Sequence, residues 1–340
     1  MSQLEREIGE QPAVLERALV ESADAIRAAA ADVRRSRPRY AVVAARGSSD
    51  NAARYFQHLF GRVCGIPVML ATPSLHTLYG AGLRYEDALV VGVSQSGASP
   101  DVVSVLQAAG AGGGLTVAVT NEPRSPLADA ARHVLELHAG PERSVAATKT
   151  YTASLGMLAA LTVAVAESSA LERELRGMPD ALDAQLRRDG VAAAAETLVD
   201  SSRLAVIGRG ANYATAFEAA LKLKELAGIA AEPASPADFL HGPIAIVDTG
   251  VPVLAFAIAG PTLASMRGVL ADVRDRGGEA IVVGDASLGG EAALGVEAAP
   301  EWLSPLVAVM PAQRLAAELA ERRGDDVDRP FGLAKVTLTR

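Results

Sequence analysis

The stretch Tyr40-Ala-Val-Val-Ala-Ala-Arg-Gly-Ser-Ser49 joins a short apolar run to a glycine turn and two hydroxyl side chains. Such a run predicts a buried strand, and the alanine-rich residues 50–60 that follow predict a helix. The stretch Leu204-Ala-Val-Ile-Gly-Arg-Gly-Ala-Asn212 repeats the pattern, with Arg209-Gly210 in the place of Arg46-Gly47. A strand, a turn and a helix are therefore expected twice in the chain.

Two later strand starts repeat at almost the same offset. Leu89-Val-Val-Gly-Val93 aligns with Pro252-Val-Leu-Ala-Phe256, and Gly113-Gly-Leu-Thr-Val-Ala-Val119 aligns with Gly277-Gly-Glu-Ala-Ile-Val-Val283. Because the register holds over three pairs, the pattern predicts an internal duplication. Apolar strands that alternate with helices, here expected at 100–109 and 262–274, are typical of a parallel sheet covered on both faces. The expected fold class is α/β, with two such domains.

The segments outside the repeats are expected to be helical. Residues 1–38 read as a pair of helices, and residues 146–198 read as long helices that link the halves. Gly177 and Pro179 interrupt the helical pattern between the halves. We expect an N-terminal helical segment at 1–38, a first domain at 39–170, a second domain at 180–323 and a C-terminal tail at 324–340.

The composition argues against several classes of protein. A formal net charge of −8 over 340 residues argues against a nucleic-acid partner. A single cysteine, Cys64, allows neither a disulfide framework nor a cysteine metal cage. No signal pattern is seen at the N-terminus, and apolar runs such as 155–165 are shorter than a bilayer span. We therefore expect a cytoplasmic protein that has no membrane contact.

Hydroxyl side chains gather where two strands of the first half end. Ser48 and Ser49 follow one strand, and Ser94-Gln-Ser-Gly-Ala-Ser99 follows another. Hydroxyls and turn amides at helix N-termini bind phosphate, and Gly97 lets the backbone approach the ligand closely. The second half has Ala257-Ile-Ala-Gly-Pro-Thr262 at this place, so the fold tolerates the loss of these groups. The alternative interpretation is that the serines only cap helices.

The second half carries the candidates for acid–base chemistry. Glu218, Lys222 and Glu225 have the spacing that places neighbours on one face of a helix, and the alternative interpretation is a solvated face of ion pairs. The proline-rich loop 232–243 carries His241 beside a Gly-Pro turn, three residues after an acid, Asp238. The other histidines are expected to be structural: His58, His76, His133 and His138.

Five motifs occur in the order found in one family. They are Ser94-Gln-Ser-Gly97, Val145-Ala-Ala-Thr-Lys149, Ala220-Leu-Lys-Leu-Lys-Glu225, His241-Gly-Pro243, and the tail Asp326-Val-Asp-Arg-Pro330 with Leu333-Ala-Lys335. From about residue 20 onward the chain resembles the isomerase half of glucosamine-6-phosphate synthase. It is equally similar to the stand-alone double-domain sugar isomerase (SIS) proteins. The resemblance implies two flavodoxin-like SIS domains.

The same resemblance implies roles for individual residues. Glu225 would be the base, Lys222 its neighbour, and His241 the ring-opening acid–base, donated by the other subunit of a homodimer. Lys335 would close the site from the tail and reach the sugar carbonyl. The residues implied to lie near the sugar are Val145, Ala146 and Ala334. The groups implied to bind its phosphate are Ser49, Ser94, Gln95, Ser96 and Ser99, to which the strand-end pattern adds Ser48.

The chain departs from the family pattern at three positions. Ala98 follows Ser-Gln-Ser-Gly, where the family commonly has an acid or a similar polar group, and Arg46 precedes Gly47, where the synthase has a small residue. Asp238 replaces the usual glutamate, so the sugar pocket is expected to be reshaped. An N-terminal cysteine nucleophile does not occur, so a glutaminase domain and synthesis from glutamine are not expected.

The chemistry implied by the resemblance is removal of a carbon-bound proton beside the carbonyl of an open-chain sugar phosphate. The first hypothesis is a deaminase/isomerase that converts glucosamine 6-phosphate to fructose 6-phosphate and ammonia. A second is a dehydratase that expels the C3 hydroxyl of N-acetylglucosamine 6-phosphate, and a third is a fructosamine-6-phosphate deglycase. The hypothesis from another class is a sugar-phosphate sensor without catalysis. No metal or organic cofactor is implied.

Overall fold

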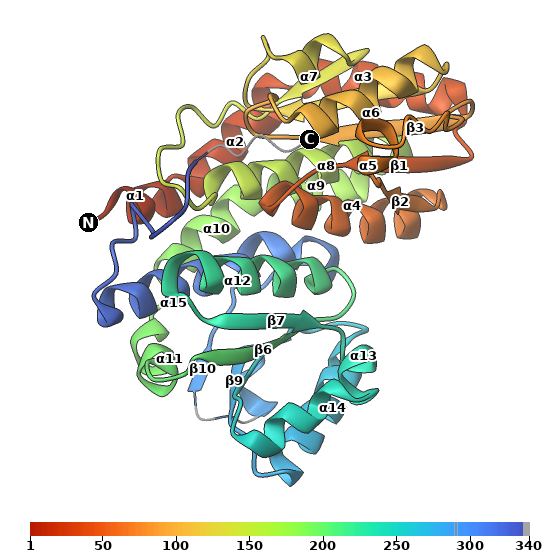
Figure 1. The fold of residues 1–340 in the computed structure, drawn as a ribbon. Helices are drawn as coiled ribbons and strands as arrows, with labels where there is room; N and C mark the ends of the chain where they lie inside the picture. The colour runs from red at the N-terminus through yellow and green to blue at the C-terminus, as the bar shows by residue number, and fades with distance from the viewer. Residues whose placement is uncertain (289, 291, 336–340) are drawn as a thin grey trace. The chain divides into compact units, whose positions relative to one another are not determined.

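The computed structural model describes residues 1–288, 290 and 292–335. Its strands form two five-stranded sheets with the orders β2-β1-β3-β4-β5 and β10-β9-β8-β6-β7, and each strand pairing is parallel (Figure 1). In both sheets the first strand in sequence lies between the second and the third. The expected α/β class with two parallel sheets is therefore confirmed, and both halves have one topology.

The strands are short, as is usual for α/β domains. Those of the first sheet are β1 Tyr40–Ala44, β2 Val68–Leu70, β3 Ala88–Val93, β4 Leu115–Thr120 and β5 His133–Glu136. Those of the second sheet are β6 Arg203–Ile207, β7 Ala230–Ala234, β8 Val253–Ala257, β9 Ala280–Gly284 and β10 Ala292–Leu294. In β3 and β8 each residue is buried, because helices cover both faces of a parallel sheet.

Contacts divide the chain into two interleaved units. The first unit comprises residues 11–142 and 149–179 together with Ala334 and Lys335. The second unit comprises residues 1–10, 143–148 and 180–333. The contiguous boundaries expected from the sequence stay a prediction.

The N-terminal segment contains three helices instead of the expected pair. They are α1 Gln3–Gly9, α2 Gln11–Glu21 and α3 Ala23–Ser36. Pro12 has no N–H to continue the hydrogen bonds of α1, so the chain breaks between α1 and α2. Helix α1 belongs to the second unit, and α2 and α3 belong to the first.

In the first unit, helices cover both faces of the sheet. The remaining helices are α4 Ser48–Cys64, α5 Ser74–Thr77, α6 Pro100–Ala111, α7 Pro126–Asp129, α8 Lys149–Ala166 and α9 Ser169–Arg176. Val102 and Leu106 of α6, with Leu127 of α7, pack on Val90 and Ala118 of the sheet. Helices α3, α4 and α8 contact the sheet as well, and α8 packs along α2, α3 and α4.

Helix α8 is longer than the apolar run considered in the sequence. By length and composition alone this 18-residue helix would suffice to cross a membrane, and no other helix among the described residues does so. However, 83% of it is buried inside the protein, as in the central helix of a core.

The second unit places two helices together over one face of its sheet. They are α12 Asn212–Ala227 and α15 Ser304–Arg323, joined there by α11 Val191–Leu198, while α13 Pro236–Leu240 and α14 Leu263–Asp275 cover the other face (Figure 1). Helix α10 Met178–Leu186 and the 3₁₀ turns η1 Pro243–Thr249, η2 Ala286–Leu288 and η3 Glu301–Leu303 complete the described elements.

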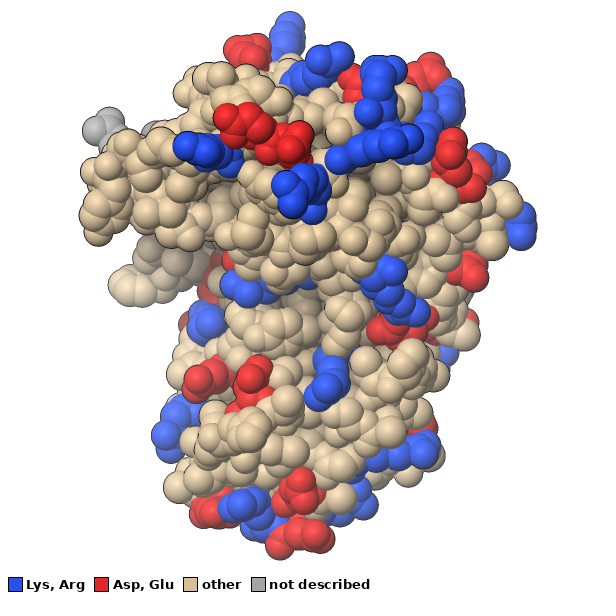
Figure 2. All heavy atoms as spheres, turned by 90° about the vertical axis from the view of Figure 1, so that its right-hand side faces the viewer, with Lys and Arg blue, Asp and Glu red and all other residues tan. Residues whose placement is uncertain are grey.

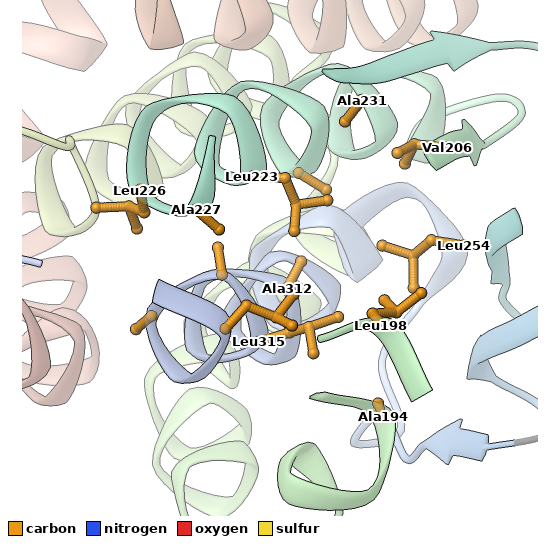
Figure 3. Packing of buried hydrophobic residues seen from close by; sticks show 14 of the residues in the cluster. Ala194, Leu198, Val206, Leu223, Leu226, Ala227, Ala231, Leu254, Ala312 and Leu315 are labelled. Atoms are coloured by element: carbon orange, nitrogen blue, oxygen red, sulfur yellow. The ribbon is translucent and has the colours of Figure 1, made fainter. Parts of the chain in front are cut away.

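Small side chains line the contact between α12 and α15. Ala227 of α12 and Ala312 of α15 allow the helices to approach closely, and Leu223 and Leu315 fill the space beside them (Figure 3). At the start of both helices the Asn212 amide donates to the Ser304 hydroxyl at 2.7 Å. The position of α12, which carries the acid–base candidates, is thus fixed by packing and by a buried hydrogen bond.

Candidate functional site

The serine-rich loops of the first unit lie at the point where the strand order reverses. β1 and β3 are neighbours in the sheet, and the chain leaves their carboxyl ends in opposite directions, to β2 and to β4. Three residues separate β1 from α4, which begins at Ser48, and six residues separate β3 from α6, which begins at Pro100. Ligands of open α/β sheets bind at such a reversal, because the two loops part there and leave a crevice.

The hydroxyls of Ser49, Ser94 and Ser99 do not act as helix caps. Gly47, which has no side chain, is the N-cap of α4, and Ser99 is the N-cap of α6 without a side-chain capping bond. In the described part of the chain, the hydroxyls of Ser49, Ser94 and Ser99 make no hydrogen bond. Ser96 accepts only a long bond, 3.3 Å, from the Ala98 N–H. The capping interpretation is therefore wrong for Ser99, and the hydroxyls are available to an anion.

Position 97 requires a glycine for two reasons, its backbone conformation and the closeness of a neighbouring side chain. Its φ of +60° lies in the left-handed region, which favours glycine. A Cβ atom at this position would collide with the side chain of Ser125, which caps α7. The Gly97 carbonyl in turn accepts from the Leu127 N–H at 3.0 Å, so the Ser94–Ser99 loop is held against α7.

Arg46 joins the two serine-rich loops. Its Nε lies 2.6 Å from Oδ2 of Asp101, which is buried in the first turn of α6. In the second unit Arg209, the duplicate of Arg46, donates at 3.2 Å to Ser265 in the first turn of α14. Because that half lacks the serines and keeps the arginine, we interpret Arg46 as a brace between loops and not as a phosphate ligand. The brace also neutralises Asp101 beside the candidate anion site.

An anion bound between these loops would be held by local donors of this kind. On the face shown in Figure 2, acidic and basic side chains are interspersed. The other first-turn carboxylate at this point, Asp50, is paired with Arg54 at 3.0 Å. The positive ends of α4 and α6 are therefore not cancelled by an unpaired acid from these two positions.

Three charged side chains of α12 form a largely buried cluster. Glu218 is 0% exposed and Lys222 is 1% exposed, whereas Glu225 keeps 26% of its side chain accessible. The Lys222 Nζ lies 2.5 Å from Glu225 Oε2 and 3.4 Å from Glu218 Oε1. The interpretation of a solvated ion-pair face is therefore wrong. Burial of charge is costly, and one ammonium shared by two carboxylates leaves Glu225 as the member that a substrate can reach.

His241 differs from the other histidines. It follows α13 and is exposed, and its ring makes no hydrogen bond within the described residues. The Asp238 carboxylate accepts instead from the Ser235 hydroxyl at 2.7 Å. Three other histidines have side-chain partners, as expected for structural residues: His76 with Tyr85, His133 with Asp32 and His138 with Glu21.

The segment with the proposed sugar contacts is anchored by a buried acid of α1. Glu7 is 0% exposed, and its carboxylate accepts from the N–H groups of Arg143 and Ser144 at 2.6 and 3.2 Å. Ala146 is itself 0% exposed and belongs to the core of the second unit. Its methyl group is thus not available to a sugar, so only its backbone can make the expected contact.

Lys335, from the tail, lies against a second buried acid. Its Nζ is 2.8 Å from Oε2 of Glu142, and both residues belong to the first unit. Neighbouring Ala334 is exposed. The structure therefore places the phosphate candidates and Lys335 in the first unit, and Glu225, Lys222, His241, Val145 and Ala146 in the second.

The sequence profile of the SIS domain matches residues 36–164 and 197–320, which contain the first and second parallel sheets. The chain belongs to the SIS domain family. Each SIS match thus covers one copy of the duplicated sheet.

Relatives of this SIS chain include an enzyme of amino-sugar metabolism. The isomerizing glutamine–fructose-6-phosphate aminotransferase of Methanothermobacter thermautotrophicus is 36% identical over 296 residues, which cover 85% of this chain and 50% of that protein. The chain thus spans about half the length of the curated relatives it matches.

Two solved SIS structures match over nearly the whole chain. A protein of Silicibacter pomeroyi DSS-3, whose assignment as a phosphosugar isomerase is provisional, has a TM-score of 0.91 and 35% identity over 96% of this chain and 100% of its own. The C-terminal domain of the glucosamine-fructose-6-phosphate aminotransferase of Francisella tularensis has a TM-score of 0.85 and 25% identity, over 97% of this chain and 98% of its own.

Two buried acids of this SIS chain were not found from the sequence. Glu7 precedes the first expected strand in a polar segment, and Glu142 lies three residues before the Val145 motif. Neither has a local pattern that indicates burial. The nearness of Glu142 to a family motif is the one signal that could have found it.

Proposed function

We propose that the protein is an amino-sugar-6-phosphate deaminase/isomerase that converts glucosamine 6-phosphate and water to fructose 6-phosphate and ammonia. The observation that carries the proposal is the buried Glu218–Lys222–Glu225 cluster with one accessible carboxylate. The five family motifs and the half-length match to isomerizing aminotransferases support it.

In this reaction the chain's own residues bind the phosphate and move a proton. The hydroxyls of Ser49, Ser94 and Ser99 with the N-termini of α4 and α6 hold the phosphate. His241 opens the ring. Glu225 removes the proton from C2 of the open-chain aldose, and a proton is returned at C1. The C2 imine that results is hydrolysed by water, which replaces nitrogen by oxygen and releases ammonia.

One assay tests this function. Purified protein is incubated separately with glucosamine 6-phosphate and N-acetylglucosamine 6-phosphate, and ammonia, fructose 6-phosphate and ultraviolet-absorbing products are followed. Ammonia with fructose 6-phosphate is the expected result for the free amine. An unsaturated acetamido sugar from the N-acetyl form identifies a dehydratase instead. Tight binding of a sugar phosphate without turnover of either substrate contradicts the proposal and identifies a sensor.

Replacement of Ser94 or Ser96 by alanine should weaken binding of glucosamine 6-phosphate by roughly 1.5–3 kcal/mol, the size of a hydrogen bond to a charged group. The fold should not change, because the second half has Ala257 and Ala259 at the aligned positions. Isothermal titration calorimetry measures the change, and Thr262→Ala in the second half is the matched control. An affinity equal to that of the wild-type protein would remove these serines from the phosphate site.

We propose a homodimer in which His241 completes the site of the partner subunit, because its exposed ring has no partner within the described chain. Mixing Glu225→Gln protein with His241→Ala protein should then restore activity, up to about a quarter of the wild-type value for random pairing with one intact site per heterodimer. Subunit exchange is followed by native mass spectrometry of tagged chains. Exchange without any recovered activity would show that each chain builds its own site.

A further inference from the structure

The contact between Glu142 and Lys335 joins a buried acid to the end of the described tail. The Glu142 side chain is 0% exposed, and the Lys335 side chain is 24% exposed. The amine donates to Oε2 at 2.8 Å. A solvent-exposed pair of this kind would contribute little, but here the acceptor is removed from water, so that the pair is screened far less.

The rest of the protein holds the Glu142 carboxylate in place without help from Lys335. Its Oε1 accepts from the Thr150 N–H at 3.1 Å, and its Oε2 accepts from the Thr150 hydroxyl at 2.7 Å. Thr150 is in the first turn of α8, where the helix end favours a negative charge. Glu142 is therefore a preformed anionic acceptor that the tail can reach.

Within residues 326–335, few other interactions with described parts of the chain hold the tail. Upstream, Asp328 accepts from the N–H groups of Gln3 and Leu4, both at 2.8 Å. After it, the side chains of Phe331 and Leu333 are exposed, at 103% and 46%. The exposed Phe331 and Leu333 therefore do not anchor residues 331–335 by apolar burial, and among the described contacts the Lys335 amine does so.

We propose that Glu142 is a positioning residue that anchors the tail through Lys335 and sets the place of its amine. The inference rests on the proposed function only for the consequence in catalysis, since Lys335 is the tail group expected to reach the sugar carbonyl. Glu142 itself acts through Lys335 and does not touch the reacting atoms. Loss of either partner should release the tail and misplace the amine.

The first test measures the tail directly and needs no substrate. Chymotrypsin cleavage after the exposed Phe331 is timed by mass spectrometry for wild-type, Glu142→Gln, Lys335→Met and the double variant. Both single variants should be cleaved faster by roughly fivefold, because the protease acts on the locally opened chain, and the double variant no faster than either. In Glu142→Gln the amide oxygen can still accept a hydrogen bond from Thr150, and Lys335→Met changes only the tail. The two variants therefore remove the ion pair through one partner at a time.

Glu7→Gln is the matched control, because Glu7 is an equally buried acid that anchors the adjacent residues Arg143 and Ser144 but has no bond to Lys335 among the described contacts. Its tail should be cleaved at the wild-type rate. Unchanged cleavage in Glu142→Gln, or effects of the two variants that add, would overturn the proposal.

The second test is kinetic and uses the substrate found in the product assay. Glu142→Gln should lower kcat by roughly tenfold in the wild-type background and not at all in the Lys335→Met background, as for residues that act as a unit. A further loss of kcat in that background would show a role that does not pass through Lys335. If neither sugar is turned over but cleavage behaves as expected, the anchor stands and the proposed function fails.

Discussion

Glu225→Gln should bind glucosamine 6-phosphate as tightly as the wild-type protein and turn it over at least about 10²-fold more slowly, the usual scale for removal of a general base. Glutamine keeps the shape of the side chain and can still contact Lys222, but it cannot accept a proton from carbon. Of the two carboxylates beside Lys222, Glu225 alone has an accessible fraction. The loss should therefore appear in kcat and not in affinity.

Solvent isotope exchange gives a second measure of the same step. In deuterated water the wild-type protein should introduce deuterium at C2 of recovered substrate or at C1 of the ketose product, and Glu225→Gln should not. Glu232→Gln, an exposed acid in the same unit, is the control and should behave as wild type. Turnover by Glu225→Gln at the wild-type rate would show that the residue is only an ion-pair partner.

Lys222→Met should lower the free energy of unfolding by about 3–5 kcal/mol, because it leaves the buried Glu218 carboxylate without its ammonium. Lys224→Met, two residues away on the exposed face of α12, should change the free energy of unfolding by no more than about 0.5 kcal/mol. Urea unfolding followed by circular dichroism compares the two variants.

The origin of that loss can be separated from simple packing. If the cost comes from an uncompensated charge, Glu218→Gln combined with Lys222→Met should be more stable than Lys222→Met alone, because the fully buried carboxylate is then replaced by a neutral amide. A double variant that is less stable by the sum of both effects would show that shape, and not charge, dominates at this position.

The sequence predicted the inner strands and the serine-rich loops, because both are local patterns. The apolar runs at Tyr40 and Leu204 were visible, and so was the glycine turn after each. None of the four edge strands, β2, β5, β7 and β10, was predicted, because three to five partly exposed residues do not stand out as a buried run. The break between α1 and α2 was also missed, although Pro12 marks it.

The spacing of charged residues in the sequence could not predict whether their side chains are buried. The spacing of Glu218, Lys222 and Glu225 fits a solvent-exposed helix face as well as a buried cluster. The packing of α15 on α12 is what buries the cluster. Glu7 and Glu142 were missed for the same reason. Their partners are N–H groups and an amine that come from distant parts of the chain.

The interleaved course of the chain affects how the protein can be divided. Leu4 and Ile8 of α1 are 0% and 3% exposed because they belong to the hydrophobic core that packs on the second sheet. They lie far from the strands of that sheet in the sequence. A truncation at the helical break near Gly177 would yield a C-terminal piece with an open apolar groove and no α1 to fill it. Such a piece would be prone to aggregation, so the second half of the chain cannot be expressed alone as a stable domain from this position.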